Sequence, residues 1–202
     1  TLFLKGDIIH TKENELSGKK EFWSFNNVRI YKEDLQGIGD SLFYSFSDSL
    51  MRIYYDPILW NDDNQMMGDT IYLQMANDQI EKIQFVENAF VSMQSKGELF
   101  NQIKGKSITG YFEDNEMRTM LSKKNAESLY FGQNDEDEYI GGNYAISDII
   151  KVSIVDKEVD KISFIKEPEA IFTPMRQMND TDRYLKDFSW VKDLRPKGKG
   201  DL

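Results

Sequence analysis

Residues 105–112 read Gly105-Lys106-Ser107-Ile108-Thr109-Gly110-Tyr111-Phe112, and this pattern of a small residue followed by alternating polar and apolar positions occurs four times in the chain. Gly39 and Gly68 open two of the other copies, and Ser147 opens the fourth without a glycine. An internal repeat of this kind indicates an architecture of similar units rather than a single active site. We therefore expect a fold assembled from four related units.

Alternation within each copy predicts a strand with one buried face, because every second side chain of a strand lies on the same side of the sheet. The apolar face has three columns: Leu42, Ile71, Ile108 and Ile150; Tyr44, Leu73, Gly110 and Val152; and Phe46, Met75, Phe112 and Ile154. The opposite face carries Ser41, Ser45, Thr70, Gln74, Ser107, Thr109, Lys151 and Ser153. This pattern is typical of an antiparallel sheet with one face against a core and one in water.

A turn and a returning strand are predicted after each of these strands. Turn-forming Asn, Asp and Ser residues follow them at 47–49, 77–78, 114–115 and 156–157, and such residues tolerate left-handed backbone or bond their own main chain. The returning strands carry apolar residues three positions apart, which predicts a bulge or bend at the start of each one. The returns are predicted to end at Asp56-Pro57, Asn88-Ala89, Asn125-Ala126 and Pro168-Glu169, and an earlier, degenerate copy at Asn27-Val28.

The composition agrees with a folded β protein. The chain has 202 residues, of which 40% are hydrophobic and 13% aromatic, enough for one elongated domain or for two fused halves with a continuous core. Only 4 prolines occur, and no Pro/Gly/Ser-rich linker divides the repeats, so one continuous sheet system is the better interpretation. We expect a single β domain at residues 1–174, followed by a capping segment and flexible tail at 175–202.

The C-terminal stretch has a different pattern. From Pro174 the alternation stops, and residues 179–185 read as a short N-capped helical turn. Phe188 and Trp190 follow, and we expect this segment to pack on an end of the sheet and cover an open edge. The alternative is a mobile segment that exposes the edge to a partner. Residues 197–202 are expected to be disordered.

The charge balance argues against nucleic acid as a partner. A net charge of −10 repels phosphates, and the body of the chain has no basic stripe interleaved with aromatic residues. The acidic clusters at 62–63 and 135–138 are interpreted as solvated loop tips. The alternative is a cation site, but neither cluster has the spacing of an EF-hand, and we expect no metal site.

Candidate catalytic residues are few. The absence of Cys excludes thiol nucleophiles and thiolate metal sites, and the single His10 is interpreted as a surface histidine. No Gly-x-Ser-x-Gly motif is present, and Gly37-Ile38-Gly39 leads into a strand rather than the helix of a dinucleotide site. We expect neither an enzyme nor a cofactor. With 35 acidic residues, a carboxylate pair of the glycosidase type remains an alternative that spacing cannot test.

The start of the chain bears on where in the cell the protein is located. No apolar run is long enough to span a bilayer, and no secretory hydrophobic region is present. Thr1 leads almost directly into the strand-like Leu2-Phe3-Leu4. We therefore expect a processed or trimmed form, from which a targeting peptide has been removed.

The repeated residues resemble a known family. The segments that resemble the OstA-like (organic solvent tolerance A) repeat are Asn64-Gln65-Met66-Met67-Gly68-Asp69-Thr70-Ile71, Asn88-Ala89-Phe90-Val91 and the stretch from Asn101-Gln102-Ile103-Lys104 through residues 105–112. This family comprises periplasmic lipopolysaccharide-transport proteins of Gram-negative bacteria. Asp56-Pro57-Ile58-Leu59-Trp60 and the ending from Phe188-Ser189-Trp190 to Arg195-Pro196-Lys197 resemble the Bacteroidetes branch more narrowly. The resemblance covers residues 22–197 and rests on the repeated pattern rather than on one invariant motif.

The resemblance implies a twisted antiparallel β-jellyroll that is open at its ends and has an apolar interior. It also implies that the acyl chains of lipid A bind in that interior, and that the protein associates edge to edge with itself or with other lipopolysaccharide-transport proteins in a bridge to the outer membrane. The candidate lipid-binding residues are the twelve residues of the three apolar columns, where Gly110 is expected to leave room beside Tyr44, Leu73 and Val152. The alternative is a structural or assembly module for the outer membrane, in which these columns fill a sandwich core and bind no lipid.

Two departures accompany the resemblance. The phosphates of lipid A have no obvious cradle in an acidic chain, so recognition is expected through acyl chains or through a basic rim, for which the candidates are Lys104, Lys106, Lys123 and Lys124. The alternative for these lysines is solubilising charge on an outer face or edge. The fourth copy lacks both the opening glycine and the glutamine present as Gln36, Gln65 and Gln102, although it keeps Asn143. Its strand is therefore expected to bend less at Ser147.

Overall fold

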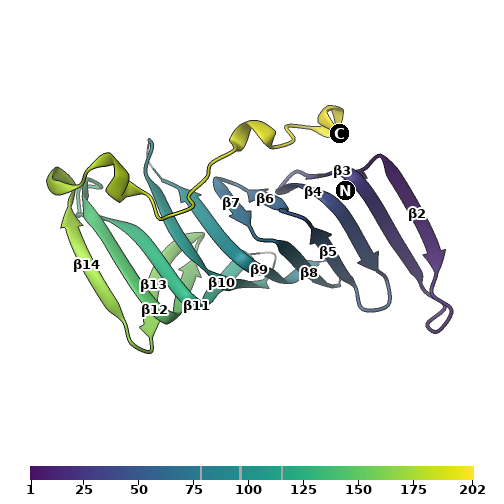
Figure 1. Ribbon diagram of the computed structural model, residues 1–202, viewed down its shortest axis with the longest axis horizontal. Helices are drawn as coiled ribbons and strands as arrows, with labels where there is room; N and C mark the ends of the chain where they lie inside the picture. Colours follow the sequence, from purple (N-terminus) through teal and green to yellow (C-terminus); the bar gives the residue numbers. More distant parts are fainter. Residues whose placement is uncertain (78, 96, 115) are drawn as a thin grey trace.

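The computed structural model describes residues 1–77, 79–95, 97–114 and 116–202, which form strands and short 3-10 helices (Figure 1). The strands are β1 (Phe3–Lys5), β2 (Ile8–Glu13), β3 (Lys20–Lys32), β4 (Leu35–Ser45), β5 (Leu50–Tyr54), β6 (Ile58–Asn61), β7 (Asn64–Met67), β8 (Thr70–Ala76), β9 (Gln79–Gln94), β10 (Phe100–Glu113), β11 (Glu116–Gln133), β12 (Tyr139–Val155), β13 (Glu158–Ile165) and β14 (Glu169–Pro174). The 3-10 helices are η1 (Met175–Gln177), η2 (Asp180–Arg183), η3 (Lys192–Leu194) and η4 (Lys199–Asp201). All strands belong to one antiparallel sheet, so the predicted all-β class is confirmed.

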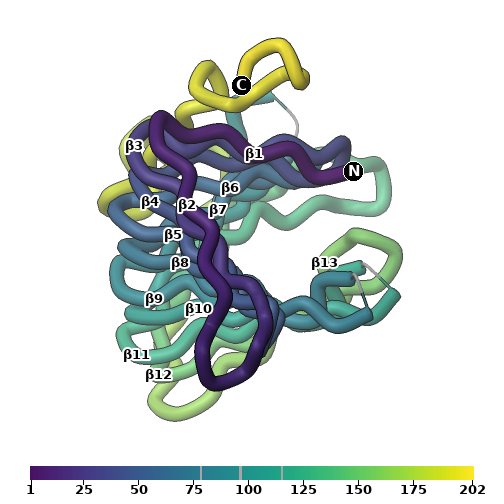
Figure 2. The backbone as a smooth tube through the Cα atoms, turned by 90° about the vertical axis from the view of Figure 1, so that its right-hand side faces the viewer, coloured from purple at the N-terminus to yellow at the C-terminus, as the bar shows by residue number. Residues whose placement is uncertain are grey.

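The sheet folds over into two layers that join along one side and diverge on the other (Figure 2). The longest strands, β3, β4 and β9 to β12, run through both layers. The shorter strands β1, β6, β7 and β14 complete what we call the upper layer, and β2, β5, β8 and β13 complete the lower layer. Neighbouring strands follow one another along the long axis, from β2 at one end to β14 at the other (Figure 1).

Three of the four repeats exchange neighbours at the small residue that opens them, whereas β10 keeps β9 and β11 as neighbours on both sides of Gly105. β4 pairs with β6 as far as Ile38 and with β5 from Ser41, so the exchange falls around Gly39. β12 changes in the same way from β14 to β13 across Ser147. The earlier copy is also present, because β3 pairs with β2 before Asn27 and with β1 after it.

Left-handed residues, rather than the glycines, bend the sheet between the layers. Gly39, Gly68 and Gly105 do not have positive φ, whereas two consecutive residues with positive φ recur at the bend, either within a long strand or between two short ones. These pairs are Asn26-Asn27, Tyr55-Asp56, Glu87-Asn88, Lys124-Asn125 and Lys166-Glu167. A left-handed residue turns an extended chain sharply. The predicted strand ends at residues 27, 88 and 125 are therefore wrong, because β3, β9 and β11 bend there and continue.

The bulges predicted for the returning strands are confirmed in three of the four copies. The pairing register shifts between β8 and β9, between β10 and β11, and between β12 and β13. The prediction is wrong for the first copy, where β4 and β5 pair without a shift. There Met51 and Ile53 are buried two residues apart and Leu50 is not, so strict alternation holds. The turn residues predicted at Asp78 and Asn115 lie outside the described residues.

The main core lies between the layers and extends from the bend to the groove described below, which Leu35 and Met66 of the core also line. It includes six residues of the predicted apolar columns: Leu42, Ile71, Leu73, Ile108, Ile150 and Val152. A second cluster lies on the outer side of the upper layer and contains Phe90, Leu129, Phe131, Met178 and Leu185. Two of its members come from the C-terminal segment. This segment therefore packs against the sheet in a second, separate hydrophobic core.

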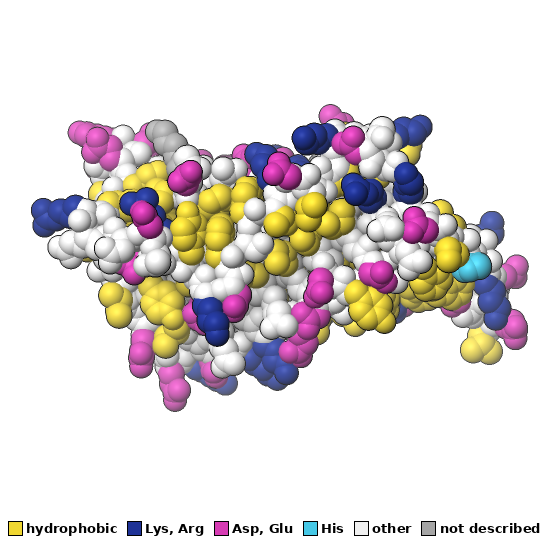
Figure 3. All heavy atoms as spheres, turned by 45° about the horizontal axis from the view of Figure 1, so that its top comes forward, with side chains coloured by type: hydrophobic (Ala, Val, Ile, Leu, Met, Phe, Trp, Pro, Cys, Tyr) yellow, Lys and Arg dark blue, Asp and Glu magenta, His cyan; other side chains and the backbone are white. Residues whose placement is uncertain are grey.

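The C-terminal residues 175–202, called the strap from here on, run back over the upper layer from β14 towards β3 (Figure 1). Hydrophobic side chains gather on this side of the molecule in the space-filling view, and Lys and Arg side chains lie near the end of the chain (Figure 3). The predicted N-capped turn is present as η2, where the Asn179 amide donates to Asp182 Oδ2 over 3.0 Å. The tail expected to be disordered contains η4, and the Lys197 amide donates to Asp201 Oδ2 over 2.6 Å.

The strap lies along a face of the sheet instead of over an open edge, because the repeated glutamines bind it. Gln102 Oε1 accepts from the Leu185 amide over 2.8 Å, and Gln65 Oε1 accepts from the Val191 amide over 2.9 Å. Gln36 Oε1 accepts from Arg195 Nε over 2.7 Å. Among the residues described, no helix combines the length and the apolar character that crossing a membrane requires.

Candidate functional site

The candidate site is a groove of about 290 Å³ between the two layers, on the side where they diverge. The groove is lined by apolar side chains: Leu35, Met66, Ile80, Ile83, Val91, Met93, Phe112, Met117, Met120, Ile154 and Val159. Polar and charged side chains border it: Lys32, Asp34, Asn61, Asp62, Asn64, Asp114, Glu116 and Lys157. The groove therefore has an apolar floor and a charged rim.

The hairpins of both layers build this arrangement. The β3–β4 and β6–β7 hairpins form the upper rim, and the β10–β11 and β12–β13 hairpins form the lower rim. Turns favour charged and polar residues, whereas the strands just inside them present apolar side chains to the interior. Met66 and Met93 belong to the upper layer, and Phe112 and Ile154 face them from the lower layer.

Only part of the predicted lipid-binding set reaches the groove. Phe112 and Ile154 line it. The six residues named above as core are at most 3% exposed, and they lie in the packed region beside the bend. Tyr44 and Met75 are half-buried, and Tyr44 packs against the main core.

Two of the inward predictions are corrected by the structure. The space expected beside Gly110 is filled, since a Cβ atom there would lie 3.1 Å from Met117 Cε. Phe46 was expected on the inward face but is 49% exposed. β4 ends at Ser45, so the alternation no longer fixes the direction of the next side chain. The Phe46 ring instead packs edge-on against Tyr44, with 4.7 Å between centroids.

Most of the groove lining was missed as a site because it comes from the returning strands. Ile80, Ile83, Met117, Met120 and Val159 belong to the three-residue apolar step that predicted the bulges. That three-residue step was the sequence signal from which these groove-lining residues could have been identified. It indicates which residues are inward, but it does not distinguish a filled interior from an open one.

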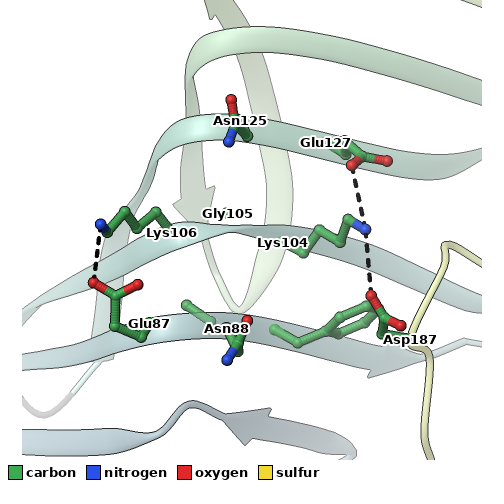
Figure 4. Close-up of a pocket in the computed structure, with 10 residues that line it drawn as sticks. Glu87, Asn88, Lys104, Gly105, Lys106, Asn125, Glu127 and Asp187 are labelled. Atoms are coloured by element: carbon green, nitrogen blue, oxygen red, sulfur yellow. Dashed lines mark ion pairs between the residues drawn. The ribbon is translucent and has the colours of Figure 1, made fainter.

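The lysines expected at a rim lie on the outside of the bend. Lys104 and Lys106 line a separate pocket of about 470 Å³ with neighbouring residues of β9 and β11 (Figure 4). Lys104 Nζ lies 3.2 Å from Glu127 Oε1 and 4.0 Å from Asp187 Oδ2, and Lys106 Nζ lies 3.1 Å from Glu87 Oε1. Lys123 and Lys124 are exposed. These lysines therefore lie on the outer surface. This agrees with the alternative interpretation, in which they are solubilising charges on an outer face or edge.

The electrostatics of this bend are local. Burial raises the pKa of Tyr144, and Glu127 raises it further, because the Tyr144 hydroxyl donates to Glu127 Oε2 over 3.1 Å and the phenolate would face a carboxylate. Glu127 therefore has both a lysine and a tyrosine as partners. Neither contact reaches the groove between the layers.

The rim carboxylates give no support to a glycosidase-type site. Asp62 on the upper rim pairs with Lys157 at 3.4 Å, and Glu116 on the lower rim pairs with Arg118 at 2.8 Å. Their side chains are 58% and 42% exposed, whereas a carboxyl that acts as a general acid needs apolar, water-excluding surroundings. Within the described ranges, no three His, Cys, Asp or Glu side chains are grouped so that they could hold a metal ion.

Comparison with known proteins identifies the fold. The sequence matches no protein-family model and no curated protein. Among solved structures, the chain is similar to LptH from Pseudomonas aeruginosa, described as the LptA homologous periplasmic component of the conserved lipopolysaccharide transport device. The TM-score is 0.54 at 12% sequence identity, over 69% of this chain and 95% of LptH. The two chains share the antiparallel β-jellyroll, which confirms the predicted fold.

Proposed function

We propose that this chain is a periplasmic, bridge-type lipopolysaccharide-transport protein of the OstA-like family, in its Bacteroidetes-type branch. The acyl chains of lipid A bind in the groove between the layers, and the protein associates with itself or with other lipopolysaccharide-transport proteins through its sheet edges. The observation that carries this proposal is an apolar groove of about 290 Å³ in a fold shared with a lipopolysaccharide-transport component.

The chemistry of the lining suits an acyl chain. Moving a methylene group out of water contributes about 0.8 kcal/mol, so an apolar groove holds a lipid without a reactive group. Four of the lining residues are methionines: Met66, Met93, Met117 and Met120. Methionine is flexible and polarisable, and it adapts to ligands of varied shape. The groove therefore favours a chain-like apolar ligand over a rigid, specifically oriented one.

The two ends of the sheet supply the surfaces for association. Every residue of β2 is exposed, including Ile8 and Ile9. At the other end, Ile171 and Phe172 of β14 are 66% and 51% exposed. An uncovered edge strand offers unpaired backbone groups to another strand. These features support addition of a neighbouring sheet at either end.

A structural or assembly module for the outer membrane is the second candidate function. The observation that favours it is the complete packing of the inner half of the interior, where Leu42, Ile71 and Ile108 are at most 1% exposed. In that case the groove near the rim would be an incidental gap. The two candidates differ in whether a lipid contacts the rim-side residues.

Photo-crosslinking separates these candidates. Benzoylphenylalanine placed at Phe112 or Met117 faces the groove, whereas the same group at Tyr111 lies on the outer face of the same strand. After ultraviolet irradiation with lipopolysaccharide, we expect a crosslinked species at positions 112 and 117 and none at 111. Folded variants that give no crosslink at 112 and 117 would contradict the lipid-carrier proposal and favour the structural module.

A further inference from the structure

The hairpin of β6 and β7 has the groove on one face and the strap on the other. Asn64 and Met66 of β7 line the groove. Gln65, which alternates with them, accepts from the Val191 amide of the strap. Trp60 lies opposite Gln65 in the hairpin, donates to its Oε1 atom over 3.2 Å and is fully buried. A short hairpin is marginally stable without packing, so its position depends on both faces.

Arg195 of the strap holds the tip of this hairpin. Its Nη1 atom donates to the Asp62 carbonyl oxygen over 2.6 Å, and its Nε atom donates to Gln36 Oε1 over 2.7 Å. Arg195 is half-buried and the next residue, Pro196, is buried, so this part of the strap packs against the sheet. Asp62 lines the groove. Arg195 therefore acts on the rim through the backbone of a lining residue.

The same network reaches the neighbouring tip of the upper rim, between β3 and β4. Gln36 Nε2 donates to the carbonyl oxygens of Lys32 and Glu33 over 2.5 and 3.0 Å. The Asn61 side chain donates to the Asp34 carbonyl oxygen and joins the two tips. Lys32, Asp34 and Asn61 all line the groove. One arginine of the strap is thus bonded, directly or through Gln36, to both hairpin tips of the upper rim.

We propose that docking of the strap controls how tightly the groove binds its ligand, with Arg195 as a positioning residue for the upper rim. The docked strap fixes the two tips where they form the groove, and a free strap lets them move and weakens binding. Because coupling between two sites is reciprocal, a ligand in the groove also holds the strap more firmly. A partner that captures the strap would then release the ligand. This inference rests on the proposed function and adds a means of regulating the same groove.

A dye titration tests the effect of the strap on the groove. N-phenyl-1-naphthylamine is titrated into the full chain, and its fluorescence reports occupancy of an apolar site. Arg195→Ala removes both side-chain bonds and should weaken dye binding roughly five- to tenfold, as expected for coupled sites. Arg195→Lys keeps the charge but loses the forked donors, and it should recover part of the affinity. The control is Lys192→Ala, an exposed position of the same strap, which should leave the affinity unchanged.

Hydrogen exchange followed by mass spectrometry tests the reverse direction. Saturating dye should slow exchange at residues 189–196 of the wild-type strap, although the dye binds on the other face of the β6–β7 hairpin. Arg195→Ala should lose this protection. A strap that only stabilises the fold would show no dye-dependent protection at 189–196 in the wild type, and that result would overturn the coupling. The wild-type measurement needs no variant, so it decides the question even if Arg195→Ala fails to fold.

The two proposals fail in different ways. Equal dye affinity in the wild type and in folded Arg195→Ala overturns the coupling and leaves the lipid groove standing. Failure of the wild type to bind the dye overturns the apolar groove as a binding site, and the coupling with it. Weaker binding by Arg195→Ala, together with dye-dependent protection of the wild-type strap, supports both.

Discussion

At the scale of single residues, the opening position of each repeat is small because another strand passes close to it. A Cβ atom at Gly105 would overlap Ser122 Oγ and would lie 3.2 Å from the Lys123 carbonyl oxygen. In the fourth copy, Ser147 Oγ itself donates to the Ile165 and Lys166 carbonyl oxygens over 2.8 and 2.9 Å. The close approach of the neighbouring strand is thus accommodated in one of two ways. The position either has no side chain, as at Gly105, or has a small side chain that hydrogen-bonds to the bend, as at Ser147.

Gly105→Ala should destabilise the protein by about 1–3 kcal/mol, because the added methyl group must displace Ser122 or the bent strand. Ser122 Oγ donates to the Lys104 carbonyl oxygen over 2.8 Å, so moving it also weakens that bond. Urea unfolding followed by circular dichroism measures the change. Gly132→Ala is the control, since a Cβ atom there would lie 3.7 Å from Ile140 Cγ1, an ordinary contact. Equal losses in the two variants would contradict the steric explanation.

At the scale of elements, the repeated glutamines explain how a segment without strands is held in place. Gln36, Gln65 and Gln102 are at most 3% exposed, and a buried amide needs hydrogen-bond partners. The strap supplies these partners: Gln102 Nε2 also donates to the Arg183 carbonyl oxygen over 2.8 Å, and Gln65 Nε2 donates to that of Ser189 over 2.7 Å. The fourth copy lacks the glutamine, and beside it Met178 of the strap approaches Gly142 instead.

Gln102→Ala should loosen the strap and reduce stability by about 1–3 kcal/mol, because it leaves the buried Leu185 amide and Arg183 carbonyl without partners. Hydrogen exchange followed by mass spectrometry should report faster exchange in the strap than in β10. Gln133→Ala is the matched control, since the exposed Gln133 side chain donates to the Asp137 carbonyl oxygen of a turn and not to the strap. If exchange in the strap stays unchanged in Gln102→Ala, the glutamine does not hold it.

The sequence predicted what local periodicity determines. The alternation of Ile71 and Leu73 identified strands and their buried face. The recurrence of Gln36, Gln65 and Gln102 was visible as well, but their partners lie in a segment that does not repeat, so nothing in the pattern indicated the contact. The same holds for Lys157 and Asp62, which meet from different repeats. For Lys104 the sequence left both a rim and an outer face open, because alternation does not tell which side of a bend a charge occupies.

At the scale of the whole molecule, the V-shaped section separates a filled interior from an open one. Near the bend the layers are close, and the apolar columns interlock as a core. Towards the hairpin tips the layers diverge, and the same kinds of side chain line a groove. Successive strands along the molecule share this V-shaped cross-section (Figure 2). A copy added at an exposed edge strand would extend it further.

Association through the ends predicts a specific effect of charge. Ile9→Lys combined with Ile171→Lys should reduce concentration-dependent self-association, because lysine on an edge strand opposes pairing with a neighbour. Analytical ultracentrifugation over a range of concentrations measures it, and stability should change by less than about 0.5 kcal/mol at such exposed sites. Ile140→Lys is the control, as Ile140 is 47% exposed but belongs to β12, which is paired on both sides. Self-association that survives the double change would argue against the edges as the contact.

The strap is also expected to limit how many repeats the chain can hold. Arrays of similar units ordinarily gain stability from contacts between neighbours alone, and they lengthen or shorten without penalty during evolution. Here one segment contacts units far apart, with Leu185 at Gln102, Val191 at Gln65 and Arg195 at Gln36. An added or deleted hairpin would put these contacts out of step. We therefore expect the spacing of these strap residues to match the number of hairpins. Because one segment contacts distant repeats, we also expect the repeats to unfold together rather than one at a time.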